Sequence, residues 1–482
     1  MTKKKKKSSS RPLSPSALAM KKKKKRTCVK SSQQQQESLE REFYLPDECW
    51  EHIFTFLINP VHPIEVFTFL NDPILIDNDG INKSYFNSLS LVSKQFLSIT
   101  NRIIFSTRIY HRQLPFLPSF FRRFSNLNSL DLWCGGSHHL DASIALTLRD
   151  RPTLKSLSIA GIDLKDANCV TSYYIDSFVS LKGLNSLKFW YSRISDDLLY
   201  SIAREGLPLK KFVLESCTGY SYSGIYGLLS KCHGIQHLGL QGVDFLNNHH
   251  VSQLSLFLPD LVSINLNECS KLTELALFAF IKNCHSLGEI SMERIHTKIK
   301  NVENAYTLKD FDVNPQLKFL RFSDNSFINN EIMVLFASIF PNLQRLDLSY
   351  CYDISGKSIC QVLSKCCKVR HLHLAGCKKM RRIKMNFVAP QLELLNLSGT
   401  SVDDKTLYDI SKSCCGLLQL LIICCKHVTE NGVMRVVEKC KQLKEICLGC
   451  CDKVNADALI SMLSSNPSSE KVKCSSEIRL KF

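Results

Sequence analysis

The sequence predicts an α/β protein, a solenoid of about 13 strand–helix units with a curved parallel sheet, preceded by a small all-α module and a disordered basic tail. Three observations support this prediction. An apolar phrase recurs at nearly constant intervals from Leu127 onward, two amphipathic helical segments precede it, and the N-terminus is strongly biased in composition. We therefore expect three parts, at residues 1–42, 43–105 and 106–482.

The solenoid is predicted by a nine-residue phrase that recurs along the chain. LQRLDLSYC begins at Leu343 and VRHLHLAGC at Val369, and the commonest interval between successive copies is 26 residues. This is the pattern of a leucine-rich repeat, whose strand and helix bury their apolar sides only when units stack. Near the C-terminus, alternation of Ile478, Leu480 and Phe482 predicts a closing strand. The copies begin at Leu127, Leu154, Leu184, Leu209, Ile235, Leu261, Leu287, Leu317, Leu343, Val369, Leu392, Leu417 and Leu443.

Half of the 22 cysteines follow the same repeat. Residues 366–377 hold three cysteines and two histidines, a spacing that by itself would suit zinc. Six cysteines, however, share the ninth position of the phrase and five lie three residues before the next unit. We therefore predict buried thiols in a reducing compartment, with no metal site and no cofactor. The ninth-position group is Cys217, Cys269, Cys351, Cys377, Cys425 and Cys451, and the second group is Cys232, Cys284, Cys366, Cys414 and Cys440.

The first 42 residues are expected to be a disordered basic tail. Residues 1–44 contain eleven Lys and three Arg against three Glu, a net charge of +11 out of +18 for the chain. Two lysine clusters resemble a bipartite nuclear import signal, which favours the nucleus, the cytoplasm or both. A solvated tail with weak nucleic-acid affinity is the alternative, and a plastid transit peptide is a further one. No apolar run approaches the roughly 20 residues of a membrane span, so no membrane partner is expected.

Two amphipathic segments follow the tail. In LPDECWEHIFTFL, Asp47 can cap a helix and four apolar residues fall on one face. In SLSLVSKQFLSITNRII, five apolar residues step by three and four. The first set is Trp50, Ile53, Phe54 and Leu57, and the second is Leu89, Val92, Phe96, Ile99 and Ile103.

These segments resemble the F-box, on the strength of Leu45-Pro46, Glu48, Ile53, Leu57 and the run 91–94, Leu-Val-Ser-Lys. The resemblance implies docking onto the Skp-type adaptor of a cullin-RING ubiquitin ligase. Its implied adaptor-facing residues are Leu45, Pro46, Ile53, Leu57, Leu91 and Val92. The alternative for each is that it holds the two helices together. Leucine-rich repeats containing cysteine frequently accompany an F-box, which strengthens the resemblance.

The module departs from the family pattern in two places. Phe96 stands where the family usually has tryptophan, and residues 58–86 form an insertion between the helices. Within the insertion VFTFLND, residues 66–72, nearly repeats IFTFLIN, residues 53–59. Whether adaptor binding tolerates this insertion stays open.

Partner contacts are expected on the concave face of the sheet, where the second, third, fifth and seventh positions of each phrase point. Tryptophan and arginine are enriched at interface hot spots. The alternative is an ordinary sheet surface. His371 and His373 are expected to be exposed neighbours of Arg345 and Asp347 in adjacent strands. The predicted substrate-binding residues are Trp133, Trp190, Phe319, Arg321, Arg345, His371 and His373.

No sequence motif of an enzyme is present: there is no glycine-rich phosphate loop and no His-Glu-x-x-His. We predict a non-catalytic substrate-recognition subunit of a plant-like Skp–cullin–F-box ubiquitin ligase, which binds an unknown protein substrate for ubiquitination. One alternative is a nuclear leucine-rich-repeat scaffold with a disabled F-box. Another is an F-box receptor for a hormone or other small molecule. Nucleic-acid binding through the tail is a further possibility.

Overall fold

The structure is a computed structural model, and it describes residues 45–58, 88–135, 142–164, 171–296, 312–455, 457–459, 461, 473–475 and 479–481. The expected tail at 1–42 and nearly all of the expected insertion at 58–86 lie outside these residues. The described residues fall into two compact units. The helical unit ends at Phe105 and includes Arg123–Asn126, and the solenoid comprises Ser106–Arg122 and the described residues from Leu127 onward.

One continuous sheet runs through the solenoid, and its first fourteen strands are parallel and paired in chain order. This confirms the predicted fold class, with one strand, β1, ahead of the first predicted unit. Two short strands follow, and the last of the chain, β16, pairs antiparallel with β14. The strands are β1 (Ser106–Tyr110), β2 (Ser129–Trp133), β3 (Ser156–Ala160), β4 (Ser186–Trp190), β5 (Lys211–Glu215), β6 (His237–Gln241), β7 (Ser263–Asn265), β8 (Glu289–Ser291), β9 (Phe319–Arg321), β10 (Arg345–Asp347), β11 (His371–His373), β12 (Leu394–Asn396), β13 (Gln419–Leu421), β14 (Glu445–Cys447), β15 (Lys473–Ser475) and β16 (Arg479–Lys481).

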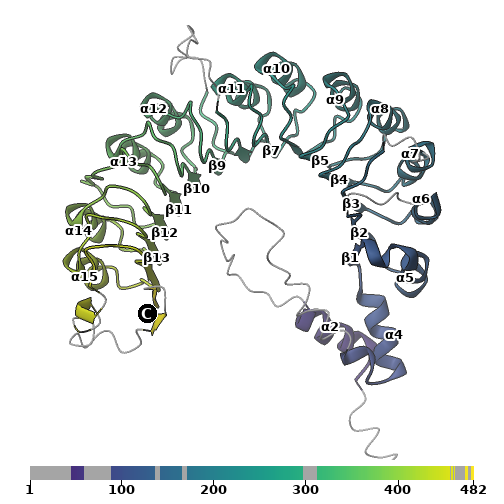
Figure 1. Cartoon of the computed structure of the whole chain (residues 1–482), viewed down its shortest axis with the longest axis horizontal. Coiled ribbons are helices and arrows are strands. Elements are labelled where there is room, and N and C mark those ends of the chain that lie inside the picture. The colour runs from purple at the N-terminus through teal and green to yellow at the C-terminus, as the bar shows by residue number, and fades with distance from the viewer. Residues whose placement is uncertain are drawn as a thin grey trace, which may run out of the picture. The chain divides into compact units, whose positions relative to one another are not determined.

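Helices follow most strands and lie on the outer, convex side of the solenoid, with the sheet on its inner side (Figure 1). Side chains at the N-cap, such as Asn329 and Asp403, accept a hydrogen bond from the backbone amide three residues later. The elements are η1 (His111–Phe116), α5 (Leu117–Arg123), α6 (Ala142–Arg149), α7 (Thr171–Ser180), α8 (Asp196–Glu205), α9 (Tyr222–Leu229), α10 (Asn248–Ser255), α11 (Glu274–Asn283), α12 (Asn330–Ile339), α13 (Gly356–Lys365), α14 (Asp404–Ser413) and α15 (Glu430–Lys439).

The apolar positions of the phrase form the core between sheet and helices. In the unit that begins at Leu343, the first, fourth and sixth residues, Leu343, Leu346 and Leu348, are fully buried. The helix that follows contributes Ile359 and Leu363 from its inner face. Each unit therefore buries its apolar side against its neighbours, as the repeat pattern requires.

Five of the six ninth-position cysteines form a ladder of buried hydrogen-bond donors, and Cys217 instead donates to Glu215 of its own unit. The thiol of Cys351 donates to the carbonyl of Phe322 at 3.1 Å, the sixth residue of the preceding unit, and Asn325 makes the same contact with Met292 at 2.6 Å. Burial raises the pKa of Cys377 to about 12, which keeps this thiol protonated as a donor. The equivalent bonds run from Cys269 to Leu240, Cys377 to Leu348, Cys425 to Leu397 and Cys451 to Ile422.

The eighth residue of the phrase turns the chain away from the strand in a left-handed conformation. In all thirteen units but the first, which has Gly135 with φ +70° one position later, the eighth residue has φ between +46° and +73°. Glycine adopts this conformation without strain, whereas other residues do so at a cost. We name these residues the eighth-position row: Gly161, Tyr191, Ser216, Gly242, Glu268, Arg294, Asp324, Tyr350, Gly376, Gly399, Cys424 and Cys450.

In the helical unit, α2 (Asp47–Ile58) and α4 (Lys94–Ile103) pack against each other. The second helix is shorter than the expected apolar pattern. It begins after Ser93, whose hydroxyl accepts the Phe96 amide at 3.1 Å, so Leu91 and Val92 lie in a turn before it. The expectation that Val92 lies on the inner face of this helix is therefore wrong.

Candidate interaction surfaces

An aromatic cluster fills the space between α2 and α4. The rings of Trp50, Phe54 and Phe96 lie 4.8 to 5.8 Å apart, and Phe54 is fully buried. Phe96 is half-buried and packs against both rings of α2, a contact that either Phe or Trp can make as a large aromatic. Ile53, which was expected on the same face as Phe54, is instead partly exposed.

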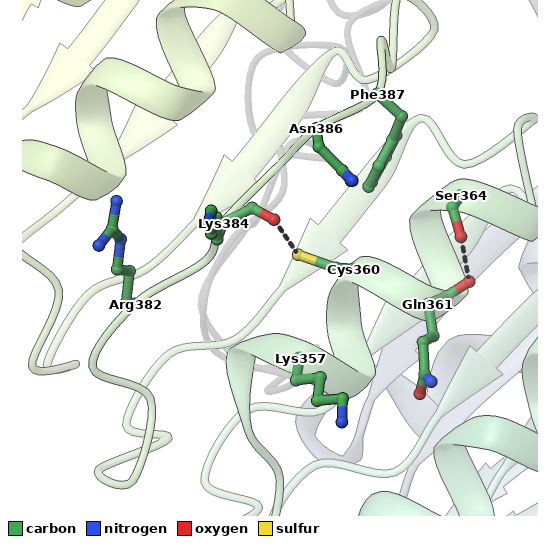
Figure 2. A pocket seen from close by; sticks show the side chains of 8 residues that line it. All are labelled: Lys357, Cys360, Gln361, Ser364, Arg382, Lys384, Asn386 and Phe387. Carbon is green, nitrogen blue, oxygen red and sulfur yellow. Dashed lines mark hydrogen bonds between the residues drawn. The ribbon is translucent and has the colours of Figure 1, made fainter.

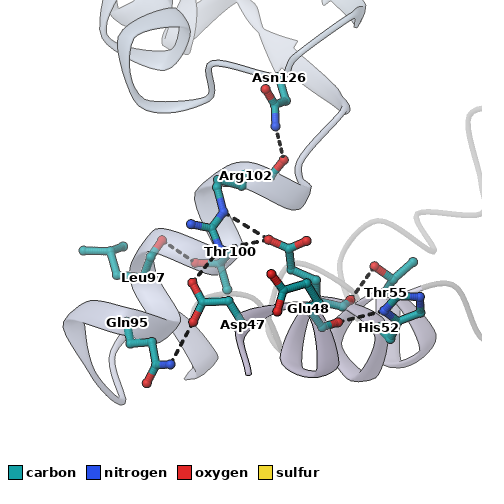
Figure 3. A network of polar contacts seen from close by, with 10 residues as sticks. Asp47, Glu48, His52, Thr55, Gln95, Leu97, Thr100, Arg102 and Asn126 are labelled. Atoms are coloured by element: carbon teal, nitrogen blue, oxygen red, sulfur yellow. Dashed lines mark hydrogen bonds and ion pairs between the residues drawn. The ribbon is translucent and has the colours of Figure 1, made fainter. Parts of the chain in front are cut away.

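Polar side chains link the two helices beside this cluster (Figure 3). The Arg102 guanidinium lies 2.8 Å from Asp47 and 2.9 Å from Glu51, and Gln95 donates to Asp47 at 2.8 Å. The hydrogen bond from Arg102 lowers the pKa of Asp47 below its ordinary value. Asp47 lies inside α2 as its first residue, and its carboxylate binds Arg102 and Gln95 of α4. The expectation that Asp47 caps the helix is therefore wrong.

Most of the residues that the F-box resemblance assigns to an adaptor are exposed. Leu91 is 85% exposed and Val92 is 65% exposed, while Leu45 and Ile53 are each 40% exposed. Pro46 is also exposed, and the side chain of Leu57 lies outside the described residues. The aromatic cluster of Trp50, Phe54 and Phe96 packs between the two helices, whereas Leu91 and Val92 are largely exposed.

The N-terminal strands of the concave face carry an aromatic segment, which we define as Tyr110, Trp133 and Trp190. The ring centroids of Tyr110 and Trp133 are 6.3 Å apart, and those of Trp133 and Trp190 are 6.5 Å apart. The register places Ala160 between the two tryptophans, and its small side chain allows the indoles to approach each other. Among the described residues, neither buried indole N–H meets an acceptor.

Charged side chains flank the aromatic segment. Arg108 lies 5.6 Å from the Trp133 ring and 2.7 Å from Asp131, and Lys188 lies 5.6 Å from the Trp190 ring. Burial and the neighbouring Lys211 lower the pKa of Lys188, because both disfavour its charged form. The arrangement presents flat aromatic surface with cations beside it. Sequence reasoning missed Tyr110 and Arg108 because their strand precedes the first Leu-x-x-Leu phrase.

The middle of the concave face carries a charged segment, comprising Glu289, Phe319, Arg321, Arg345, Asp347, His371, His373 and Glu393. Arg321 lies 3.0 Å from Glu289, and Arg345 lies over the Phe319 ring at 5.3 Å. His371 is 3.6 Å from Glu393. The predicted residues of these three strands, β9 to β11, are therefore neighbours, but several already have partners within the chain.

The two histidines lie where the register predicted but are less exposed than expected. His371 pairs with Arg345 and His373 with Asp347 in adjacent strands, as the sequence indicated. His373 is buried and His371 is half-buried, so the expectation that both are exposed is wrong. Side chains on a concave sheet converge, and burial lowers the pKa of both imidazoles despite the nearby carboxylates of Asp347 and Glu393.

The C-terminal strands of the concave face form an apolar segment that sequence reasoning missed, made of Leu394, Leu421, Ile423 and Cys447. Its residues occupy the third, fifth and seventh positions, which in the charged segment hold mostly polar side chains. The signal was present in LELLNL, where a leucine stands at the third position. The concave face thus changes along the solenoid from aromatic to charged to apolar.

A basic depression lies on α13 and the irregular segment that follows β11 (Figure 2). Lys357, Arg382 and Lys384 line it, and the Cys360 thiol donates to the Lys384 carbonyl at 3.3 Å. Arg382 also lies 3.6 Å from Asp409. These residues lie outside the strands, so the depression is not part of the concave face on which partner contacts were expected.

Two further findings concern the described residues only. No three His, Cys, Asp or Glu side chains among them gather in a group that could hold a metal ion. None of the helices in the described ranges is both long enough and apolar enough to cross a membrane.

Comparison with known proteins confirms the resemblance inferred from the sequence, at low identity. No family model matches the chain. It is 28% identical to F-box/LRR-repeat protein 4 of Bos taurus over 141 residues, covering 28% of this chain and 22% of the relative. It is 22% identical to F-box protein MAX2 of Arabidopsis thaliana, and the match covers 80% of this chain and 58% of the relative. It is 23% identical to GRR1-like protein 1 of Arabidopsis thaliana, and that match covers 52% of this chain and 48% of the relative. The chain thus spans 22% to 58% of the length of these relatives.

Solved structures with a similar architecture share little sequence with the chain. A chain of the Rad7 and Elc1 complex in yeast is 15% identical, with 88% of this chain and 96% of that chain covered and a TM-score of 0.42. An internalin from Listeria monocytogenes is 12% identical, with 80% and 91% covered and a TM-score of 0.43.

Proposed function

We propose that this chain, which resembles F-box/leucine-rich-repeat proteins, is a substrate-recognition subunit of a Skp–cullin–F-box ubiquitin ligase. In this proposal the helical unit binds a Skp-type adaptor and the concave face of the solenoid binds a target protein. Ubiquitin transfer would take place on other subunits, so this chain contributes proximity between substrate and transfer enzyme.

The observation that carries the proposal is the exposure of Leu91 and Val92. The two side chains precede α4 in a turn fixed by the Ser93 cap and are largely exposed, whereas the aromatic interior of the unit is complete without them. Two adjacent apolar residues in solvent are unfavourable unless a partner covers them. The resemblance assigns both to an adaptor-facing surface.

Adaptor binding tests the first half of the proposal. Purified adaptor is titrated calorimetrically with the wild-type chain, with a Leu91→Ala/Val92→Ala variant and with a Leu45→Ala/Pro46→Ala variant. We expect each double substitution to weaken binding at least tenfold. Val388→Ala is a matched control, since Val388 in the solenoid is 66% exposed and Val92 is 65% exposed.

The adaptor experiment also distinguishes the scaffold alternative. A deletion of residues 60–85 removes most of the insertion. No binding by the wild type, but binding by the deletion variant, would mean that the insertion disables the F-box and that the chain is a leucine-rich-repeat scaffold. No binding by either form would reject adaptor docking.

The second half of the proposal concerns capture of a target protein on the concave face. The aromatic segment offers the half-buried indole rings of Trp133 and Trp190, and the charged segment offers Arg321 and Arg345. Crosslinking in cells, followed by mass spectrometry, is compared between wild type and a Trp133→Ala/Trp190→Ala variant. We expect the variant to lose target proteins while it retains the adaptor. Loss of both together would indicate a folding defect instead.

Nuclear location is part of the proposal and rests on the lysine clusters at 3–7 and 21–25, which lie outside the described residues. A fluorescent fusion of the full chain is compared with one that lacks residues 1–30. Import by the clusters predicts nuclear signal that the deletion shifts to the cytoplasm. An unchanged distribution would reject this role, and plastid signal would favour the transit-peptide alternative.

A further inference from the structure

Neighbouring side chains of the eighth-position row contact each other across repeats. Arg294 forms an ion pair with Glu268 of the preceding unit. The ring of Tyr350 lies against Gly376 of the following unit, where an added Cβ would come within 2.4 Å of the ring. The left-handed turn therefore aligns the side chains of this row closely enough for direct contact between successive units.

Two cysteines occupy adjacent places in this row, at the C-terminal end of the solenoid. Cys424 and Cys450 are the eighth residues of the last two full units, with φ of +57° and +58°. Both are exposed, and the register that pairs Leu421 of β13 with Cys447 of β14 aligns Cys424 with Cys450 three residues further along. The Cys424 amide donates to the carbonyl of Gly449, the residue before Cys450, at 2.8 Å.

The backbone at this point suits a disulfide. Adjacent strands of a sheet lie about 4.8 Å apart. A disulfide needs Cα atoms roughly 4.4 to 6.8 Å apart and Cβ atoms that point toward each other. Paired units with matching left-handed turns and a backbone hydrogen bond between them meet the first condition. Both side chains leave equivalent turns and are exposed, so rotation about their Cα–Cβ bonds can bring the two sulfurs together.

We propose that Cys424 and Cys450 form a redox-active dithiol, which a hydroperoxide oxidises to a disulfide between the last two full repeats. This site is independent of the proposed ligase function, because it requires neither an adaptor nor a target protein.

The chemistry needs one hydroperoxide for each disulfide. One thiolate attacks the peroxide, the O–O bond breaks, and a sulfenic acid and one water are formed. The second sulfur then attacks the sulfenic sulfur and releases the second water as the S–S bond forms. The two thiols lose two protons and two electrons in total, and hydrogen peroxide is reduced to two waters.

The closeness of the two cysteines offsets the low thiolate fraction of Cys424. Partial desolvation and the neighbouring Cys450 thiol raise the pKa of Cys424, which lowers its thiolate fraction. The first oxidation is therefore slow, but the second step is intramolecular and fast. Once oxidised, the pair should proceed to the disulfide before further oxidation occurs.

The cysteines next to this pair make an internal control. Cys425 and Cys451 are ninth-position residues, buried, and each donates to a carbonyl of the preceding unit. Burial raises the pKa of Cys425 to about 11, so its thiolate is scarce and shielded. These two thiols should remain reduced under conditions that oxidise the exposed pair.

Peptide mapping of the full chain tests the proposal. The reduced protein is treated with stoichiometric hydrogen peroxide, alkylated, digested without reductant and analysed by mass spectrometry. We expect a cross-linked peptide pair in which fragmentation places the bond on Cys424 and Cys450, and dithiothreitol should reverse it. Cys367→Ser, at another exposed cysteine, should leave the cross-link unchanged.

A second probe works without oxidation. Phenylarsine oxide bridges two close thiols, so it should protect Cys424 and Cys450 from alkylation in the wild type. In Cys424→Ser, Cys450 should lose this protection, and in Cys450→Ser, Cys424 should lose it. Equal alkylation with and without the arsenical, or a cross-link on Cys425 and Cys451, would overturn the proposal.

Discussion

Gly376 lies directly under the ring of Tyr350, the equivalent residue of the preceding repeat. A Cβ on Gly376 would come within 2.4 Å of Cδ1 and 2.6 Å of Cε1 of that ring. Gly376 also has φ +69°, so it combines a left-handed backbone with a close contact. Gly399, the next residue in the row, has φ +67°, but the nearest atom to its added Cβ is 3.6 Å away.

A comparison of Gly376 with Gly399 separates the energetic cost of a left-handed backbone from the cost of a clash with a neighbouring ring. Gly399→Ala should lower the free energy of unfolding by about 1 kcal/mol, because only the left-handed conformation opposes it. Gly376→Ala should cost about 1–3 kcal/mol more, because the Tyr350 ring must move. Urea unfolding followed by circular dichroism measures both. Adding Tyr350→Ala should recover most of the excess, and equal losses in the two glycine variants would contradict this account.

The ninth-position ladder predicts that donors can replace cysteine. Cys351→Ala should lower the free energy of unfolding by about 1–3 kcal/mol, because the buried Phe322 carbonyl loses its donor. Cys351→Asn should cost less, since Asn325 makes the same bond one unit earlier. Thermal unfolding compares the two variants. A cysteine that served only as apolar filling would tolerate alanine better than asparagine.

Glu293 is 5% exposed on the concave face, and it predicts a pH dependence of stability. Burial, and then the charge of Asp347, raise its pKa above the ordinary value of 4.5. The folded state therefore holds a proton that the unfolded state releases. The resulting stabilisation is complete below about pH 4.5 and is lost as pH rises through the folded-state pKa.

Glu293→Gln should remove the loss of stability that accompanies rising pH, because glutamine has no charge to bury. The variant should be at least as stable as wild type at pH 7 and should lose the advantage near pH 4. Urea unfolding at several pH values measures the difference. Glu331→Gln, an exposed position in α12, serves as control, and a similar pH profile for both variants would reject the role of Glu293.

In the helical unit, substitutions of core residues and of exposed residues should have different effects on stability. Phe54→Ala should destabilise the unit by about 3–5 kcal/mol, because Phe54 is 1% exposed and contacts Trp50 and Phe96. Leu91→Ala should change stability by less than about 0.5 kcal/mol, since Leu91 lies in solvent. Limited proteolysis within residues 45–105 reports both. Strong destabilisation by Leu91→Ala would mean that this side chain packs inside the unit, and its use as a docking test would fail.

Much of the solenoid could be predicted because its signal is repeated many times. A single Leu-x-x-Leu-x-Leu phrase is ambiguous, but copies at intervals near 26 residues allow one structural solution, in which leucines face a shared core. The same repetition removed the zinc interpretation of residues 366–377. β1 escaped prediction because STRIY lacks the leading leucines, and the structure identifies it only through its pairing with β2.

The candidate surfaces were predicted less completely, because they depend on which side chains meet across strands. The sequence placed Trp133 and Trp190 on the concave face, but not the approach of their rings across Ala160. It placed His371 and His373 beside Arg345 and Asp347, but not the burial of His373. Curvature decides that burial, and no single unit of the sequence encodes curvature.

The sequence by itself determined the repeat and the positions of strands β2 to β14. These features follow from local periodicity, which each unit carries in full. Only the tertiary structure decided that Arg102 joins α4 to Asp47 and Glu51, that Leu91 and Val92 are exposed, and that Cys424 lies beside Cys450. The two contacts link residues far apart in the chain, because packing of the two helices brings Arg102 to its carboxylates and stacking of the repeats aligns the two cysteines.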